Sequence, residues 1–183
     1  MKKFCLLVFI LVVIGLGFFF ILNQQYVQVA PSSVPSISVT SPPPTQVSLT
    51  KVIKVIDGDT IEVESGDKVR YIGINTPEME SSECYAQEAT NEDKLLVLGK
   101  TVRLEKDVSE TDKYGRLLRY VYVQDPVVGS NQEIFVNNYL VGMGYAVTMT
   151  VPPDVKYKNV FADSQNFAKE NKLGLWGKCF KPL

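Results

Sequence analysis

The sequence predicts an α+β fold: a small five-stranded β-barrel with about three helices, preceded by an N-terminal transmembrane helix and a linker. Three observations lead to this expectation. An apolar run opens the chain, a stretch rich in Pro, Ser and Thr follows it, and the remainder alternates short strand-like segments with helical ones. We therefore divide the chain into an anchor at 1–23, a linker at 24–47 and one compact domain at 48–183.

The first apolar run predicts the location of the protein. Residues 4–22 are all apolar or glycine, and Lys2 and Lys3 precede them. Such a run can cross a bilayer, and lysines before it favour a cytoplasmic N-terminus. We expect a single-pass protein of the cell membrane whose domain faces outside. The alternative is a signal peptide cleaved near Ala30, which would give a secreted protein.

Charge and composition exclude several function classes. Residues 48–183 hold 17 of the 19 Lys and Arg and all 20 Asp and Glu, which gives a net charge of −3. A domain that binds duplex DNA through a broad cationic face would be more basic, so contact with a polyanion must be local. The chain has no histidine, which excludes a Ser/His/Asp triad and histidine-bound zinc.

The domain contains two of the three cysteines, Cys84 and Cys179. In an oxidising compartment such a pair suggests a disulfide, which would stabilise the domain by roughly 4–5 kcal/mol in the chain-entropy model. Two unpaired thiols are the alternative.

Strand signals and one inserted helix predict the barrel. A three-stranded meander is followed by a helix that Ser82 caps and Gly99 ends, and two more strands come after it. This order favours a closed barrel of the OB type, a fold that commonly binds single-stranded nucleic acid. The five expected strands are 51–56, 60–63, 68–74, 101–106 and 117–124.

Two further helices are expected near the C-terminus. A short one covers 136–143, and a longer one follows Asp154 and ends at Gly174. The longer helix carries a stripe at helical spacing that we expect to pack in the core. The stripe consists of Tyr157, Val160, Phe161, Ser164, Phe167 and Ala168.

Candidate chemical groups gather in segments 57–60, 70–78 and 112–116. In the first, glycine between two aspartates lets carboxylate oxygens converge on a hard cation such as calcium, although most such segments are simple turns. In the second, Arg70 shares a predicted strand face with apolar residues, so its charge needs a partner. That partner is either a phosphate or a carboxylate in a structural ion pair.

These segments resemble the staphylococcal nuclease family in order and spacing, from about Leu49 to Trp176. The resemblance implies an OB-fold hydrolase that cleaves phosphodiester bonds of DNA or RNA with the help of calcium or another divalent cation. The matching strings are Val55 to Thr60, Arg70 with Asn75 to Glu78, Thr111 to Arg116, Val136-Asn137 and Leu173 to Trp176.

The resemblance also implies catalytic roles. Arg70 and Arg116 would grip the phosphate, and Glu78 would act as general base or orient the attacking water. Two planar guanidinium groups suit the charge that builds on the phosphoryl oxygens. Lys113 and Tyr114 would bind the substrate, although the same residues are also typical of a hairpin turn.

A metal site is implied as well. Asp59 would bind the ion through its carboxylate, Asn75 through its side chain and Thr76 through its backbone carbonyl, while Asp57 would support the ion through bound water. The family commonly has an aspartate where this chain has Asn75. An amide oxygen still binds calcium but carries no charge, so we expect weaker affinity or altered metal choice.

Two other functions compete with the nuclease. One is a non-catalytic nucleic-acid-binding barrel, since some family members keep the fold without the chemistry. The base-stacking tyrosines of the type enzyme are absent, with Thr150 and Pro152 in their places, so base binding should be looser. The other is a surface adhesion module, which only the anchor and linker favour. We expect a monomer.

Overall fold

The computed structural model describes residues 47–124 and 132–179, which belong to one compact unit spanning 43–183. The predicted anchor at 1–23 and nearly all of the linker lie outside the described residues. Among the described helices, none combines the length and apolar character that a bilayer crossing requires.

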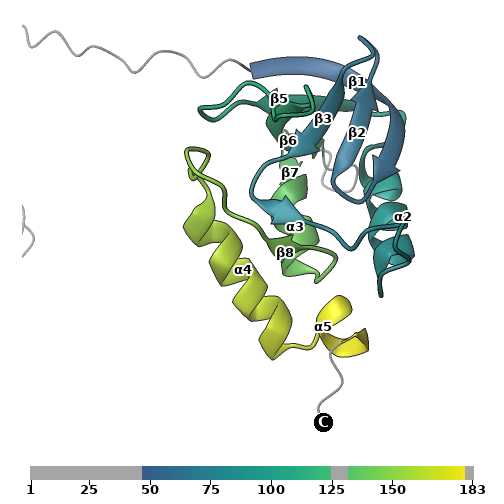
Figure 1. Cartoon of the computed structure of the whole chain (residues 1–183), viewed down its shortest axis with the longest axis vertical. Coiled ribbons are helices and arrows are strands. Elements are labelled where there is room, and N and C mark those ends of the chain that lie inside the picture. The colour runs from purple at the N-terminus through teal and green to yellow at the C-terminus, as the bar shows by residue number, and fades with distance from the viewer. Residues whose placement is uncertain (1–46, 125–131, 180–183) are drawn as a thin grey trace, which may run out of the picture. The chain divides into compact units, whose positions relative to one another are not determined.

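The prediction of a five-stranded closed barrel is confirmed (Figure 1). The strands follow the order β3-β2-β1-β5-β6, and β3 also pairs with β6, which closes the sheet. Strand β1 is long enough to pair with β5 through its first half and with β2 through its second. The five strands are β1 (Val47–Asp57), β2 (Thr60–Val63), β3 (Lys68–Tyr71), β5 (Thr101–Glu105) and β6 (Leu117–Gln124).

The predicted third strand, 68–74, is wrong in its second half. The strand ends at Tyr71 because Gly73 adopts a left-handed conformation, with φ +82°. A Cβ atom at Gly73 would lie 2.4 Å from the Phe161 ring, so any side chain at this position would clash with that ring. Arg70 therefore does not share a continuous strand face with Ile72 and Ile74.

Three short strands were not predicted. Strand β4 (Ile74–Asn75) pairs with β8 (Val147–Thr148), and β7 (Glu133–Phe135) extends the barrel sheet beside β6. Strands of two or three residues are too short to show an alternating pattern in the sequence.

Four helices accompany the barrel in the described residues. The first, α2 (Ala86–Val97), packs beside β1, and the predicted cap is wrong. Ser82 lies in a preceding turn with φ +53°, and the helix begins after Tyr85 without a side-chain cap. The others are α3 (Val136–Gly142), close to its predicted range, α4 (Lys158–Glu170) and the short α5 (Leu175–Lys178).

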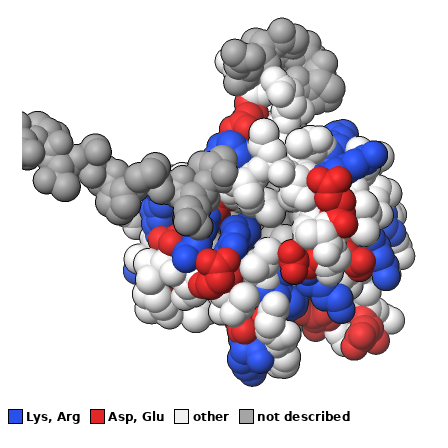
Figure 2. Space-filling view, turned by 90° about the horizontal axis from the view of Figure 1, so that it is seen from above, with Lys and Arg blue, Asp and Glu red and all other residues white. Residues whose placement is uncertain are grey.

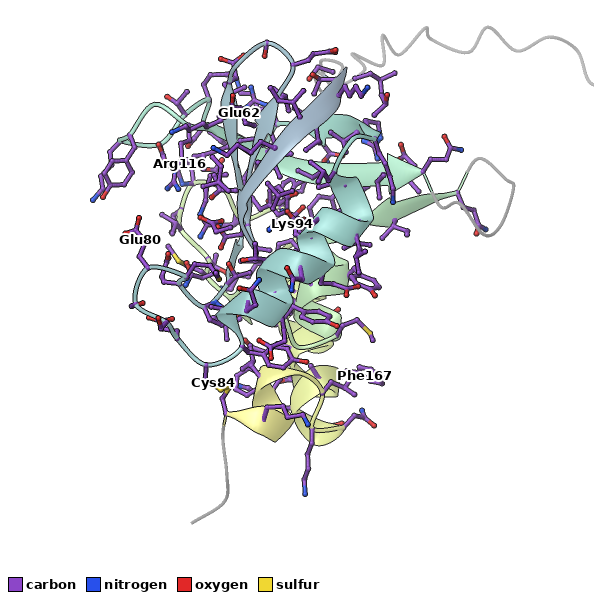
Figure 3. The ribbon with its side chains drawn as sticks, turned by 90° about the vertical axis from the view of Figure 1, so that its right-hand side faces the viewer. Glu62, Glu80, Cys84, Lys94, Arg116 and Phe167 are labelled. Atoms are coloured by element: carbon purple, nitrogen blue, oxygen red, sulfur yellow. A yellow bond between two sulfur atoms is a disulfide. The ribbon has the colours of Figure 1, made fainter. Side chains whose placement is uncertain are left out.

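The predicted core stripe of α4 is only partly correct. Phe161 and Ala168 are buried, whereas Val160 is 43% and Phe167 55% exposed. Figure 3 labels Phe167 on the outside of the helix. The helix packs mainly against α3, so only a narrow edge of it faces the core.

A buried asparagine ties the barrel together. Asn137 is fully buried; its side-chain oxygen accepts from Val121 N at 2.9 Å, and its amide nitrogen donates to Ile72 O at 3.0 Å. It thus connects β6 to the turn after β3 and satisfies two backbone groups that would be costly to bury unpaired. Asn137 belongs to one of the strings that resemble the nuclease family, and these two hydrogen bonds give it a structural role.

The C-terminal helices are anchored by a close approach of two glycines. Gly144 and Gly174 lie so close that a Cβ at Gly144 would be 2.3 Å from Leu173 O, and one at Gly174 would be 2.2 Å from Gly144 O. Leu175 N donates to Gly144 O at 2.9 Å, and the Leu175 side chain is buried. Helix α5 is thereby fixed to the segment after α3.

We predict that Gly144→Ala destabilises the protein more than Gly99→Ala does. Both positions have nearly the same left-handed backbone, with φ +76° and +75°, so both variants carry a conformational cost of about 1–2 kcal/mol. Gly99 has open space around its Cα, whereas Gly144 faces backbone, which adds about 1–3 kcal/mol of overpacking. Urea unfolding of the two variants measures the difference, and equal midpoints would contradict the prediction.

Candidate active site

A pocket of about 470 Å³ opens where β3 ends and β6 begins. The parallel pairing of these strands sets Arg70 opposite Leu118, two residues after Arg116. Both predicted phosphate-binding arginines therefore line the same pocket, together with Lys113 and Tyr114. The rest of its wall is formed by Tyr71, Ile72, Gly73, Ile74, Ser109, Asp112, Leu118, Met149, Val151, Pro152 and Asp154.

Arg70 is largely buried and has partners on three sides. Its Nη2 lies 3.1 Å from Asp59 Oδ2 and donates to Asn75 Oδ1 at 2.9 Å, while its Nη1 donates to Tyr71 O at 2.8 Å. The sequence left open whether Arg70 pairs with a phosphate or with a carboxylate, and the structure shows a carboxylate partner. The guanidinium forms an ion pair with a carboxylate and also lines the pocket.

Asp59 is held in a tight turn beneath Arg70. Its Oδ2 accepts from Thr76 N at 2.8 Å, and its own N donates to Asp57 Oδ1 at 3.0 Å. A Cβ at Gly58 would lie 2.8 Å from the Thr76 side chain, so glycine permits the close approach. Burial raises the pKa of Asp59 from 3.8 to about 6; Arg70 opposes this rise and Asp57 adds to it.

The three predicted metal ligands lie together. Asp59 Oδ2 and Asn75 Oδ1 both lie within 3.1 Å of the same guanidinium nitrogen, so these oxygens already converge on a cationic group. Thr76 O accepts from Asn75 Nδ2 at 3.2 Å. Carboxylate, amide and carbonyl oxygens are donors that a hard divalent cation takes, so the residues fit such an ion. No cluster of three His, Cys, Asp or Glu side chains suited to a metal occurs in the described part of the chain.

Arg116 is positioned by a residue that we had given no role. Asp112 Oδ2 accepts from Arg116 Nε at 2.7 Å, and Asp112 Oδ1 accepts from the backbone N–H of Tyr114 and Arg116. These bonds hold the side chain of Arg116 and also close the turn at Gly115, where φ is +81°. The Asp-x-x-Gly-Arg spacing was the available sequence signal, because a carboxylate often caps such a turn.

Lys113 and Tyr114 belong to that turn and to the pocket wall at once. Tyr114 is 72% exposed, with Lys113 Nζ 4.9 Å and Arg116 Cζ 5.4 Å from its ring centre. The turn expected here is therefore confirmed, and substrate binding by Lys113 and Tyr114 stays a prediction. Opposite them the wall is aliphatic, since Met149, Val151 and Pro152 line the pocket.

Glu78 is less closely placed than the arginines. It lies in an exposed loop and does not line the pocket. Glu78 follows Thr76 by two residues, so its Cα lies within about 7 Å of the Thr76 Cα. Thr76 N in turn donates to Asp59. Its backbone is fixed by Glu83, whose Oε2 accepts from Glu78 N at 3.0 Å. Figure 3 shows Arg116 and the neighbouring Glu80 projecting from the same side of the ribbon.

The structure joins the two domain cysteines. Cys84 and Cys179 form a disulfide across 95 residues, which links the loop before α2 to the end of α5. Four of the predicted site residues, Arg70, Lys113, Tyr114 and Arg116, line the pocket. Asp59 and Asn75 contact Arg70, Thr76 and Asp57 are bonded to Asp59, and Glu78 lies on the adjoining loop.

Behind the site lies a buried acid that we had not singled out. Asp93, on α2, is fully buried and accepts from the Tyr71 hydroxyl, at 3.0 Å to Oδ1 and 3.3 Å to Oδ2. Burial raises the pKa of Asp93 well above its usual value; the Tyr71 bond lowers it, and nearby Asp59 and Asp57 raise it further. The pKa of Tyr71 is also raised, chiefly by burial.

The surface charge agrees with local rather than broad recognition of an anion. Figure 2 shows basic and acidic side chains interspersed on the face it presents, without a continuous cationic area.

The sequence of this domain is similar to that of known proteins. Residues 68–178 match the family described as Staphylococcal nuclease homologue, and the chain belongs to that family. It is 36% identical over 133 residues to the thermonuclease of Staphylococcus hyicus. This match covers 69% of the chain and 74% of that protein.

Two Bacillus subtilis (strain 168) proteins are similarly close. The chain is 37% identical over 133 residues to the SPbeta prophage-derived endonuclease YokF and to the endonuclease YncB. Each match covers 68% of this chain, but only 43% of YokF and 60% of YncB. The chain thus spans less than two thirds of these two relatives.

We predict that Asp93→Asn changes stability in a pH-dependent way. A raised pKa in the folded state favours folding below the usual Asp value of 3.8 and loses that contribution as the pH rises. Each pH unit between the unfolded and folded values costs wild type about 1.4 kcal/mol, which asparagine does not lose. The stability of the variant relative to wild type should therefore increase from pH 4 to pH 8 in thermal melts. Asp163→Asn on the exposed face of α4 is the control, and a constant difference for Asp93→Asn would contradict the prediction.

Proposed function

We propose that this protein is a metal-dependent nuclease that hydrolyses phosphodiester bonds of DNA or RNA. The observation that carries the proposal is that Arg70 and Arg116 line one pocket, while Arg70 also contacts the oxygens of Asp59 and Asn75. Membership of the nuclease family and the similarity to named endonucleases support it.

In the proposed reaction, Arg70 and Arg116 bind the non-bridging oxygens of the phosphate. Each guanidinium keeps one side toward its carboxylate, Asp59 or Asp112, and this contact fixes its orientation. Glu78 accepts the proton of a water whose oxygen forms the new bond to phosphorus. The bond to the leaving ester oxygen breaks, and that oxygen takes a proton from solvent water and leaves as the alcohol. The arginines stabilise the charge that develops on the phosphoryl oxygens.

The proposed metal ion is calcium or a related divalent cation. Asp59, Asn75 and the carbonyl of Thr76 would hold it, with Asp57 supporting it through water. When bound, the ion would supply Lewis-acid stabilisation of the phosphate. Because Asn75 is neutral, the set has one charge fewer than a pair of carboxylates would provide.

The pocket wall suggests how the substrate lies. Tyr114 and Lys113 would contact the nucleotide on the turn side, and Met149 with Val151 on the other. An aliphatic wall offers contact area without the stacking that an aromatic ring gives, so we expect weak discrimination among bases.

We further propose that the domain works outside the cell as a monomer, either anchored in the membrane by residues 4–22 or secreted after their removal. The disulfide supports an oxidising compartment, because cysteines of cytosolic proteins are normally kept reduced.

A non-catalytic nucleic-acid-binding barrel is the second candidate function. It is favoured by the neutral Asn75 and by the position of Glu78 outside the pocket lining. In that case the pocket would bind a nucleic-acid end without hydrolysing it.

We predict that Glu78→Gln lowers kcat on single-stranded DNA by about 10²–10⁴-fold, because it removes the general base while keeping the size of the side chain. Glu80→Gln, two residues along the same exposed loop, should leave kcat within about twofold. A fluorogenic oligonucleotide assay in calcium measures both. An inactive wild type that still binds the oligonucleotide would instead support the second candidate, and equal activities of the two variants would contradict the role of Glu78.

We predict that Asn75→Asp increases calcium affinity, because it adds a carboxylate to the proposed ligand set. The same change places a second acid beside Arg70. Calorimetric titration of wild type and variant with calcium tests the prediction, with Asn91→Asp on the exposed face of α2 as the control for added charge. Equal affinities in all three proteins would refute it.

A further inference from the structure

We propose that the Cys84–Cys179 disulfide is a positioning element for Glu78, so that full activity requires the oxidised protein. The inference rests on the proposed function, because it assigns the disulfide a role through the general base. It is carried by the exposure of the loop that bears Glu78 and by the way the two ends of that loop are fixed.

The loop has little burial to hold it. All seven residues from Glu78 to Cys84 are exposed. Fixing a residue costs about 1–2 kcal/mol of backbone entropy, and buried apolar area is what normally offsets this cost. An exposed segment with a defined conformation therefore needs another constraint.

The two ends of the loop are held in different ways. At the start, Thr76 N donates to Asp59 at 2.8 Å, which fixes the chain two residues before Glu78. At the end, Cys84 is bonded to Cys179, next to α5, as Figure 3 shows at the lower left. Between these points Glu83 closes the loop on itself: its N–H donates to Glu78 O at 3.1 Å, and its carboxylate accepts from Glu78 N.

The partner of Cys84 is itself well anchored. Cys179 N donates to Leu175 O at 2.8 Å, and Leu175 is buried and bonded to Gly144. The disulfide therefore connects an exposed loop to a buried contact of the C-terminal helices. Without it, residues 78–84 would keep their hydrogen bonds to one another but lose their covalent link to that contact.

The consequence for catalysis follows from the division of the site. Arg70 and Arg116 lie on barrel strands and their adjoining turn, whereas Glu78 lies on the loop. Loss of the disulfide should leave phosphate binding intact and misplace the base. A displacement of about 1 Å at a catalytic group can cost about 10²-fold in rate.

The test uses the full-length chain with Cys5→Ser as background, so that no third thiol can exchange. We expect Cys84→Ser/Cys179→Ser to lower kcat on single-stranded DNA by about 10- to 100-fold, with KM within threefold of the parent. Reduction of the Cys5→Ser protein should give the same loss, and reoxidation should restore the activity. A kcat within twofold of the parent, or a loss that appears mainly in KM, would overturn the proposal.

A cycle with Glu78 separates positioning from general stability. In a Glu78→Gln background the cysteine variant should cause no further loss, since the group being positioned is already absent. Additive losses would overturn the proposal. If the cysteine variant does not fold, reduction of the Cys5→Ser protein under native conditions replaces it, and an unchanged kcat after reduction would contradict the inference.

These experiments also separate the positioning role of the disulfide from the proposed nuclease activity. A low activity of Glu78→Gln together with full activity of the reduced protein would sink the inference and leave the proposed function standing. Full activity of Glu78→Gln would remove the proposed base, and the positioning role with it.

Discussion

The parallel pairing of β3 with β6 is the constraint on which the rest of the site depends. It closes the barrel, and its register places Arg70 opposite Leu118, just beyond the turn that bears Arg116. Two arginines that are 46 positions apart in the sequence thereby face one pocket. Asn137 supports this pairing from behind, because it bonds both to β6 and to the turn after β3.

Buried charge around the pocket is balanced by pairs rather than by solvent. Arg70 lies between Asp59 and Asn75, Arg116 lies against Asp112, and Asp93 holds the Tyr71 hydroxyl on the inner side. Each guanidinium is held by a carboxylate in the structure, so the phosphate binding that we propose would need little reorganisation. Breaking one member of a buried pair would leave its partner uncompensated, which costs more than the pair contributes.

The barrel could be predicted from the sequence because its five strands are four or more residues long and rich in β-branched and aromatic residues, and because turns such as Ser65-Gly66-Asp67 separate them. The shortest strands, such as β4, left no such pattern. The sequence did not predict the true start of α2. Serine is a common capping residue, but the backbone at Ser82 is left-handed, with φ +53°. Phe167 has helical spacing, but which edge of α4 faces the barrel depends on α3, and spacing alone does not show it.

Some residues of the candidate site could be predicted from the sequence, and others could not. The resemblance to the nuclease family pointed to Asp59, Asn75 and both arginines, and the chemistry of phosphate and metal binding agrees with these residue types. Asp93 could not be recognised, since nothing local distinguishes a buried aspartate on a helix from a solvated one. Its partner Tyr71 is 22 positions away, and only the packing of α2 against the barrel joins them.

The disulfide also sets an order of events during synthesis. Cys179 follows every described strand and helix, and Cys84 precedes it by 95 residues. At about 5–20 residues per second, Cys84 is made roughly 5–20 seconds before its partner. The loop that bears Glu78 is thus tied down last, after the strands of the barrel have already emerged.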